Sequence, residues 1–158
     1  MINSFKDEYK GFSNFEPVPI FYKHYIFPSV EHAFQASKEL HPGYYFYKIL
    51  ALSADKANIA KRLGRKLKIR PDWDKVKLNL MEKFLRQKFE YEKFKNLLLS
   101  TGDEILIEGN WWHDNFWGDC HCDKCKDKEG QNNLGKILIR IREGSNTNHE
   151  CNNNRRYS

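Results

Sequence analysis

Residues 29–38 have the sequence SVEHAFQASK, and this stretch decides how the chain is interpreted. Ser29 follows a proline and is a favourable N-cap, so a helix is expected to begin here. A helix repeats every ~3.6 residues, which puts Glu31, Gln35 and Lys38 on one face. A carboxylate and an amine at this spacing, with an aromatic side chain between them, suit acid–base or covalent chemistry on a sugar. The same pair also suits a solvated ion pair of small energetic value.

The two alternatives differ in the burial of Lys38. Burial lowers the pKa of a lysine, so a partly buried Lys38 could attack a carbonyl or an opened sugar and form a Schiff base. Glu31 would then act as a general acid or base, or stabilise an oxocarbenium-like centre. No cofactor is expected for this catalysis.

The size and composition of the chain fit one globular domain. It has 158 residues, of which 40% are hydrophobic, and it contains no apolar run long enough to cross a membrane. The N-terminus lacks the apolar stretch of a secretory signal, so a cytoplasmic protein is expected. The net charge of +6 favours anionic ligands such as phosphates, and it would help an approach to nucleic acid.

Sequence patterns predict short strands and several helices. A hairpin of aromatic and β-branched residues is expected at 20–22 and 25–27, and a strand at 104–108. Proline, glycine and apolar spacing predict helices at 44–52, 91–99 and 134–141, and one that runs to Leu63 from a cap at Ser53 or Asp55. A further helix is expected to open at Pro71 and Asp72, with an apolar stripe from Val76 to Leu85. The last residues lack periodicity, so we expect a domain at 1–143 followed by a disordered tail at 144–158.

A loop at 109–119 holds three of the four tryptophans. Indoles in a turn-rich loop can stack on a nucleobase, and Asp114 could orient a ribose hydroxyl or a base edge. The alternative is a loop whose indoles fill a gap in the core.

Two further segments carry polar side chains with two alternative roles. Ser13 and Asn14, between two aromatics that include Phe15, can cap a turn or hydrogen-bond a ligand. Arg65 lies in a basic stretch that is either a solvated face or a phosphate clamp.

Three cysteines are clustered within six positions, at Cys120, Cys122 and Cys125. With His113 or His121 as a fourth ligand they suit a tetrahedral zinc site, which would be structural because the protein fills every position. The alternative is a set of reduced thiols without a metal.

Several short motifs occur together in one order. They are FSNF at 12–15, VEHxFQAxK at 30–38, GR at 64–65, RPDW at 70–73 followed by Lys77 and Met81, KF at 88–89, LLxTGD at 98–103, DxxWG at 114–118 and GxNxLGK at 130–136. The ordered set resembles the NADAR family, also called YbiA-like, over residues 11 to 143. The cysteine cluster is absent from the best-known bacterial branch of that family, which suggests that this chain belongs elsewhere in it.

The resemblance implies an α+β fold in a compact single domain, mainly helical with a small β-sheet, and an N-glycosidase activity on N-ribosyl bonds. It implies that Glu31 is the catalytic glutamate, that Lys38 attacks the anomeric carbon, and that Asp114 takes part in catalysis. The residues expected to bind substrate are Ser13, Asn14, Phe15, Gln35, Arg65, Trp73, Trp117 and Gly118.

Two branches of the family imply two substrates for a monomeric enzyme. One branch removes ADP-ribose from modified guanine in nucleic acid, and the net charge and the cysteine cluster favour it slightly here. The other acts on ribosylaminopyrimidine phosphates of riboflavin biosynthesis. The non-enzymatic alternatives are a module that binds ADP-ribose or a nucleotide without turnover, and a zinc-stabilised nucleic-acid binder.

Overall fold

The computed structural model describes residues 1–154 of the chain, with side chains through residue 146. Its described elements are mainly helices together with two two-stranded sheets, so the fold class is α+β, as predicted. Contacts group the chain into two compact units, Ser13–Tyr91 and a second unit that combines Met1–Phe12 with the chain from Glu92 onward. Each unit is described by itself below.

The unit Ser13–Tyr91 begins with the predicted hairpin. Strands β1 (Ile20–Tyr22) and β2 (Tyr25–Phe27) pair antiparallel, with Ile20 opposite Phe27. The two turn residues, Lys23 and His24, both have positive φ angles of 48° and 68°. Two left-handed residues match the right-handed twist of a tight hairpin, so the connection needs only these two residues.

Helix α1 (Val30–Ala36) lies at the centre of this unit, and all seven of its residues are buried. It packs against three other helices of the unit and against both strands of the hairpin. The packed helices are α2 (Tyr44–Leu50), α3 (Ala57–Leu63) and α4 (Trp73–Lys88). Short 3-10 turns, η2 (Ala54–Lys56) and η3 (Gly64–Lys66), flank α3. A helix with no solvated face must satisfy its polar side chains inside the protein, which makes Glu31 and Gln35 unusual.

The ends of α1 explain the position of Lys38. Ser29 caps the helix as predicted, because its Oγ accepts the backbone N–H of His32 at 3.2 Å. The helix ends at Ala36, earlier than the helical segment through Lys38 that the spacing argument assumed. Lys38 lies in the turn that follows, where its N–H donates to the carbonyl of Gln35 at 3.2 Å.

The second unit is built from its own helices and short strands. Here η1 (Asp7–Phe12) and α6 (Asn133–Asn154) both pack against α5 (Glu92–Ser100). Strands β3 (Gly109–Asn110) and β4 (Asp119–Cys120) pair in parallel.

The prediction of a strand at 104–108 is wrong. Within the described residues this segment forms a single isolated β-bridge, between Ile2 and Leu106. The buried guanidinium of Arg142, in α6, binds this segment instead. It donates to Thr101 Oγ1 and to the carbonyl of Glu104, both at 2.8 Å.

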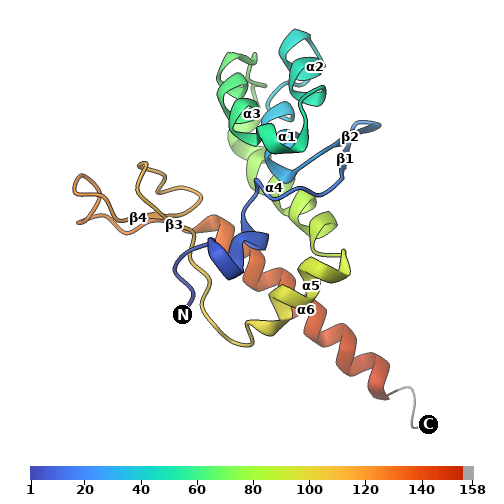
Figure 1. The fold of residues 1–158 in the computed structure, drawn as a ribbon, viewed down its shortest axis with the longest axis vertical. Helices are drawn as coiled ribbons and strands as arrows, with labels where there is room; N and C mark the ends of the chain where they lie inside the picture. The colour runs from blue at the N-terminus through green and yellow to red at the C-terminus, as the bar shows by residue number, and fades with distance from the viewer. Residues whose placement is uncertain (155–158) are drawn as a thin grey trace. The chain divides into compact units, whose positions relative to one another are not determined.

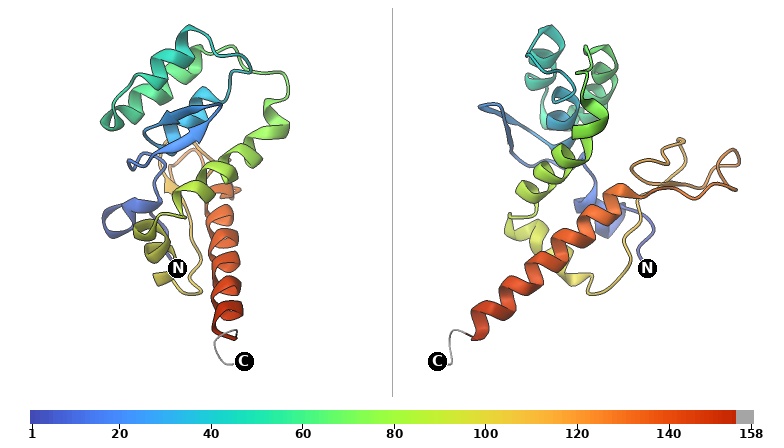
Figure 2. Two further views of the ribbon diagram at one scale, coloured as in Figure 1. Left: turned by 90° about the vertical axis from the view of Figure 1, so that its right-hand side faces the viewer. Right: turned by 180° about the vertical axis from the view of Figure 1, so that it is seen from behind.

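Helix α6 continues past Glu143, where we expected the ordered domain to end (Figure 2). It runs through Gly144 to Asn154, and the disorder expected for the tail at 144–158 stays a prediction. Residues 155–158 of the predicted tail lie outside the described residues. Among the described helices none is long and apolar enough to span a membrane.

Candidate active site

The carboxylate of Glu31 is held inside the Ser13–Tyr91 unit. Its side chain is only 6% exposed, and the Gln35 amide Nε2 donates a hydrogen bond to Glu31 Oε1 at 2.8 Å. The backbone N–H of Glu31 donates to the carbonyl of Asn14 at 3.0 Å. Two contacts from different segments therefore position the predicted catalytic glutamate.

Lys38 is half-buried, and its surroundings act on its charge. Burial lowers the pKa of Lys38 below the ordinary lysine value of 10.5. The carboxylate of Glu31 opposes this shift and raises the pKa, whereas the cations of Lys61 and Arg65 lower it further. A lysine nucleophile requires a lowered pKa of this kind, because only the neutral amine has a free electron pair.

The backbone of Lys38 is also fixed by a distant segment. Its carbonyl accepts the N–H of Arg70 at 2.7 Å. The Arg70 side chain forms a two-pronged ion pair with Asp72 at 2.6 and 2.9 Å, just before α4 begins. The turn that carries Lys38 is thus tied to the start of α4.

Gly64 packs directly against the Gln35 side chain. A Cβ atom at Gly64 would meet Gln35 Oε1 and would lie 2.7 Å from Gln35 Cδ. A glycine at this position therefore lets η3 approach the amide that holds Glu31. The next residue, Arg65, has an exposed side chain.

The segment Ser13–Phe15 forms a turn. Ser13 Oγ accepts the N–H of Phe15 at 3.2 Å, and the carbonyl of Ser13 accepts the buried amine of Lys88 at 2.7 Å. Asn14 donates from Nδ2 to the sulfur of Met81 at 3.6 Å. The turn-capping role considered for Ser13 is confirmed, and the hydrogen bond from Lys88 stabilises the turn.

Three buried side-chain atoms of this unit have no hydrogen-bond partner within the described part of the chain: Asn14 Oδ1, Gln35 Oε1 and His32 Nε2. The two oxygens belong to residues that we predicted to bind substrate, whereas His32 was given no such role. An unpaired buried acceptor costs about 1–3 kcal/mol of folding free energy, so its presence calls for an explanation. Hydroxyl groups of a bound sugar would supply the missing hydrogen-bond donors.

Trp73, at the start of α4, packs against the central helix. Its ring centroid lies 5.1 Å from that of Phe34, with the planes tilted by 49°. The indole therefore contributes to the contact between α4 and α1 and remains partly exposed.

In the other unit, Asp114 organises the tryptophan loop. Its Oδ1 accepts the backbone N–H groups of Phe116 and Trp117 at 3.2 and 2.9 Å. Asn110 fixes the same turn, because its Nδ2 donates to the carbonyl of Asp114 at 2.7 Å. One oxygen of the predicted catalytic Asp114 thus has a structural role.

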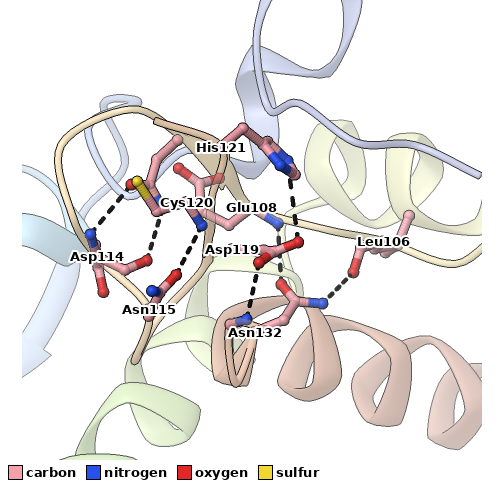
Figure 3. A network of polar contacts seen from close by, with 10 residues as sticks. Leu106, Glu108, Asp114, Asn115, Asp119, Cys120, His121 and Asn132 are labelled. Carbon is pink, nitrogen blue, oxygen red and sulfur yellow. Dashed lines mark hydrogen bonds and ion pairs between the residues drawn. The ribbon is translucent and has the colours of Figure 1, made fainter. Parts of the chain in front are cut away.

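A polar network extends from this loop to α6 (Figure 3). Asn115 Oδ1 accepts the N–H of Cys120, and Asp119 Oδ1 accepts the N–H of Gly130, both at 2.8 Å. Asn132 bridges two segments, because it donates to the carbonyl of Leu106 and accepts the N–H of Glu108. Side-chain amides hold the loop backbone where regular strands are only two residues long.

The aromatic residues of the loop fall into two groups. Trp117 is half-buried, and its ring lies edge-on to Phe116 with centroids 4.9 Å apart. Trp111 and Trp112 are 64% and 52% exposed, so they do not fill a gap in the core. Gly118 is required by close packing, since a Cβ there would meet the backbone carbonyl of Glu108.

Three thiols and one imidazole converge next to this loop. The ligand atoms of His113, Cys120, Cys122 and Cys125 all lie within 4.8 Å of one another, so the group could hold a metal ion. Burial, followed by hydrogen bonds that the Cys125 thiol donates to the sulfurs of Cys122 and Cys120, raises the pKa of Cys125 to about 11. His121 is not part of the group, and its Nε2 lies 4.0 Å from Asp119 Oδ2.

Comparisons with known proteins agree with this arrangement. The family model of the NADAR domain matches residues 2–144, which include residues of both units. This chain belongs to the NADAR family. The N-glycosidase YbiA of Escherichia coli is 37% identical over 143 residues, covering 89% of this chain and 84% of YbiA. The N-glycosidase Npun_R5314 of Nostoc punctiforme is also 37% identical, over 85% of each chain.

The NADAR fold is also found in a solved structure. The NMR structure of E. coli YbiA superposes with a TM-score of 0.75 at 32% identity, covering 94% of this chain and 89% of that chain. A riboflavin biosynthesis protein of Vibrio vulnificus is 36% identical over 87% of this NADAR chain, which spans 36% of that longer protein.

The structure brings together part of the predicted NADAR site. Glu31, Gln35 and Lys38 interact, and Asn14 meets Glu31 through its backbone. Asp114, Trp117 and Gly118 form a second group within the other unit. The roles of both groups in catalysis and binding stay predictions.

Sequence reasoning placed Lys88 in a family-like motif without a role in this site, and it missed Lys61. Lys88 is fully buried, and it faces the Ser13 turn from the last turn of α4. Its position on the buried side of an apolar stripe could have indicated a structural or functional role, since a lysine rarely occupies such a position without a partner. Lys61 acts only through its charge, which spacing along the chain does not reveal.

We expect the substitution Gly64→Ala to destabilise this NADAR chain. The new Cβ would displace the Gln35 amide from Glu31, and overpacking of this kind costs about 1–3 kcal/mol. Urea unfolding followed by circular dichroism measures the change. The control is Gly144→Ala in α6, where a Cβ meets nothing within 4 Å and alanine is expected to be neutral or stabilising. Equal stabilities of Gly64→Ala and the wild type would contradict the proposed packing.

Proposed function

We propose that this chain hydrolyses the N-ribosyl bond of ADP-ribosylated guanine in nucleic acid, using Glu31 and Lys38. Its family relatives are named N-glycosidases, and the enzyme class is accordingly a hydrolase of N-glycosyl bonds. The single observation that supports the residue assignment is the lowered pKa of a half-buried Lys38 close to the buried Glu31. A lysine with this environment is poised to react as the neutral amine.

The proposed reaction has two stages. In the first, the neutral Nζ of Lys38 forms a bond to the anomeric carbon while the bond to the base nitrogen breaks. The base leaves with the bonding electron pair and takes up a proton, and the attacking amine loses a proton to Glu31. In the second, opening of the ribose ring gives an imine, and water adds to it, releasing the sugar and restoring the amine. The balance is one water consumed for each base released.

The remaining groups of the site are assigned binding roles. Asn14 Oδ1 and Gln35 Oε1 would accept hydrogen bonds from ribose hydroxyls, which would pair both buried acceptors. The exposed guanidinium of Arg65 would bind a phosphate oxygen. Asp114 keeps one carboxylate oxygen beyond its structural bonds, and that oxygen would orient the substrate.

Two observations favour a nucleic-acid substrate. Trp111 and Trp112 are adjacent indoles that face solvent in the loop that carries Asp114. Exposed aromatic rings stack on bases of a single strand, at about 1–3 kcal/mol for each base. The net charge of +6 would also favour a polyanion.

The second candidate substrate is a ribosylaminopyrimidine phosphate. The naming of the Vibrio relative as a riboflavin biosynthesis protein favours it. The chemistry at Glu31 and Lys38 would be the same, since both substrates carry an N-ribosyl bond next to a phosphate. A side-by-side assay that follows free base from both substrates separates the two candidates. Binding of ADP-ribose without base release from either would instead support a module that only binds.

We expect ADP-ribose to be trapped on Lys38 by borohydride. The aldehyde form of the sugar condenses with the neutral amine, and reduction fixes the imine as a stable mass adduct. Mass spectrometry of the intact protein and of its peptides should find the adduct on Lys38. The substitution Lys38→Ala should abolish it, whereas the control Lys68→Ala, at an exposed lysine, should retain it. An undiminished adduct in Lys38→Ala would exclude Lys38 as the nucleophile.

Base release should increase with pH as Lys38 loses its proton, with a midpoint below the 10.5 of an ordinary lysine. The cation of Lys61 lowers the pKa of Lys38, so Lys61→Gln should raise that pKa and move the midpoint to higher pH. The profile is measured as kcat/KM against pH, and Lys68→Ala is again the control. A midpoint that stays fixed in Lys61→Gln, or moves to lower pH, would contradict the assigned electrostatics.

The double substitution Trp111→Ala/Trp112→Ala should discriminate between large and small substrates. We expect it to lower kcat/KM about tenfold or more on an ADP-ribosylated oligonucleotide, because stacking is lost, and to leave a free ADP-ribosylated nucleoside unaffected. Phe21→Ala, at an exposed aromatic of β1, is the matched control. Equal losses on both substrates would show that the indoles do not act by binding a strand.

A further inference from the structure

The segment between residues 111 and 130 has almost no hydrophobic core. Its buried residues are Gly118, Cys120 and Cys125, and two of these three are cysteines. The strand that it contains, β4, is two residues long. A segment of this length with so few buried side chains needs another source of order, and in small folds that source is commonly a metal or a disulfide.

The side chains that meet in this segment have the chemistry of zinc ligands. His113 Nδ1 lies 3.1 Å from Cys122 Sγ and 3.5 Å from Cys125 Sγ. Tetrahedral zinc, with bonds of about 2.0–2.3 Å, keeps its ligand atoms about 3.5–3.8 Å apart. Both distances from His113 lie close to that spacing, and the ligand atoms of all four residues lie within 4.8 Å of one another. The backbone N–H of His113 also donates to Cys120 Sγ at 3.3 Å, which would stabilise a thiolate there.

The backbone supports convergence of these ligands. His113 has a φ angle of 67°, a left-handed conformation that is uncommon for a residue with a side chain. Cys122 and Cys125 are joined by a turn in which the N–H of Cys125 donates to the carbonyl of Cys122 at 2.9 Å. This turn brings two thiols to the same side, and His113 faces both of them.

We propose that His113, Cys120, Cys122 and Cys125 bind one zinc ion as a closed structural site that fixes the tryptophan loop. The protein fills all four positions, which excludes an open coordination site for substrate. Two of the ligands, His113 and Cys120, bracket residues 114–119, which contain Asp114, Trp117 and Gly118. The ion would therefore hold both ends of the segment that we assign to substrate binding. Binding of zinc does not depend on the proposed function. An effect of zinc on base release does depend on it.

Metal analysis of the purified protein tests the site directly. The chain is prepared under reducing conditions without chelator, and its zinc content is measured by mass spectrometry. We expect about one zinc per chain in the wild type and less than a tenth of that in Cys122→Ser/Cys125→Ser. Two controls should keep the full content, Cys151→Ser at the remaining cysteine of the sequence and His121→Asn at the neighbouring histidine. Folded wild-type protein without bound zinc, even after zinc is added back, would overturn the proposal.

A spectroscopic measurement keeps the test valid if the double variant does not fold. Replacement of the ion by Co²⁺ in the wild-type protein should give intense bands of a tetrahedral thiolate site, and titration with a chelator should remove them. Hydrogen exchange of residues 113–125 should rise at least tenfold when the ion is removed, while exchange in α4 should stay unchanged. Unchanged exchange at 113–125 would show that a bound ion does not order the loop. Loss of base release on chelation without faster exchange would instead indicate a catalytic metal.

Discussion

The hydrogen bond from the Gln35 amide to the Glu31 carboxylate is the interaction on which the proposed chemistry depends. A carboxylate enclosed in a fully buried helix is costly unless it is paired, and Gln35 provides a donor for it. Gly64 fits against that amide and keeps it in place. The charge retained on Glu31 in turn acts on Lys38, whose amine is otherwise governed by burial and by neighbouring cations. Burial of α1 therefore couples folding to reactivity.

Local sequence patterns were sufficient where neighbouring residues decide the conformation. The hairpin at 20–27, the cap at Ser29 and helix α4 all have short-range causes, and each is confirmed. Helical spacing singled out Glu31 and Lys38, and the likeness of the ordered motifs to the NADAR family implied their roles. Their interaction in the structure supports that choice without testing it by chemistry.

Other features depend on contacts between distant segments, which periodicity does not reveal. Helix α1 ends at Ala36, and the following turn is fixed by the N–H of Arg70, some thirty residues further along the chain. The segment 104–108 has the composition of a strand, yet Arg142 and Asn132 take its carbonyls and leave one bridge. Of the two histidines that spacing left open as metal ligands, only His113 joins the cysteines, because its left-handed backbone turns the ring toward them.

The contrast between two lysines of the Ser13–Tyr91 unit has a pharmacological consequence. Lys88 is fully enclosed and donates to the Ser13 carbonyl, whereas Lys38 is half-buried with an amine that gives up its proton more readily than an ordinary lysine. Electrophiles such as aldehydes and activated esters react with free amines and not with ammonium ions. A salicylaldehyde-type warhead linked to a phosphate mimic is therefore a reasonable design for a covalent inhibitor directed at Lys38.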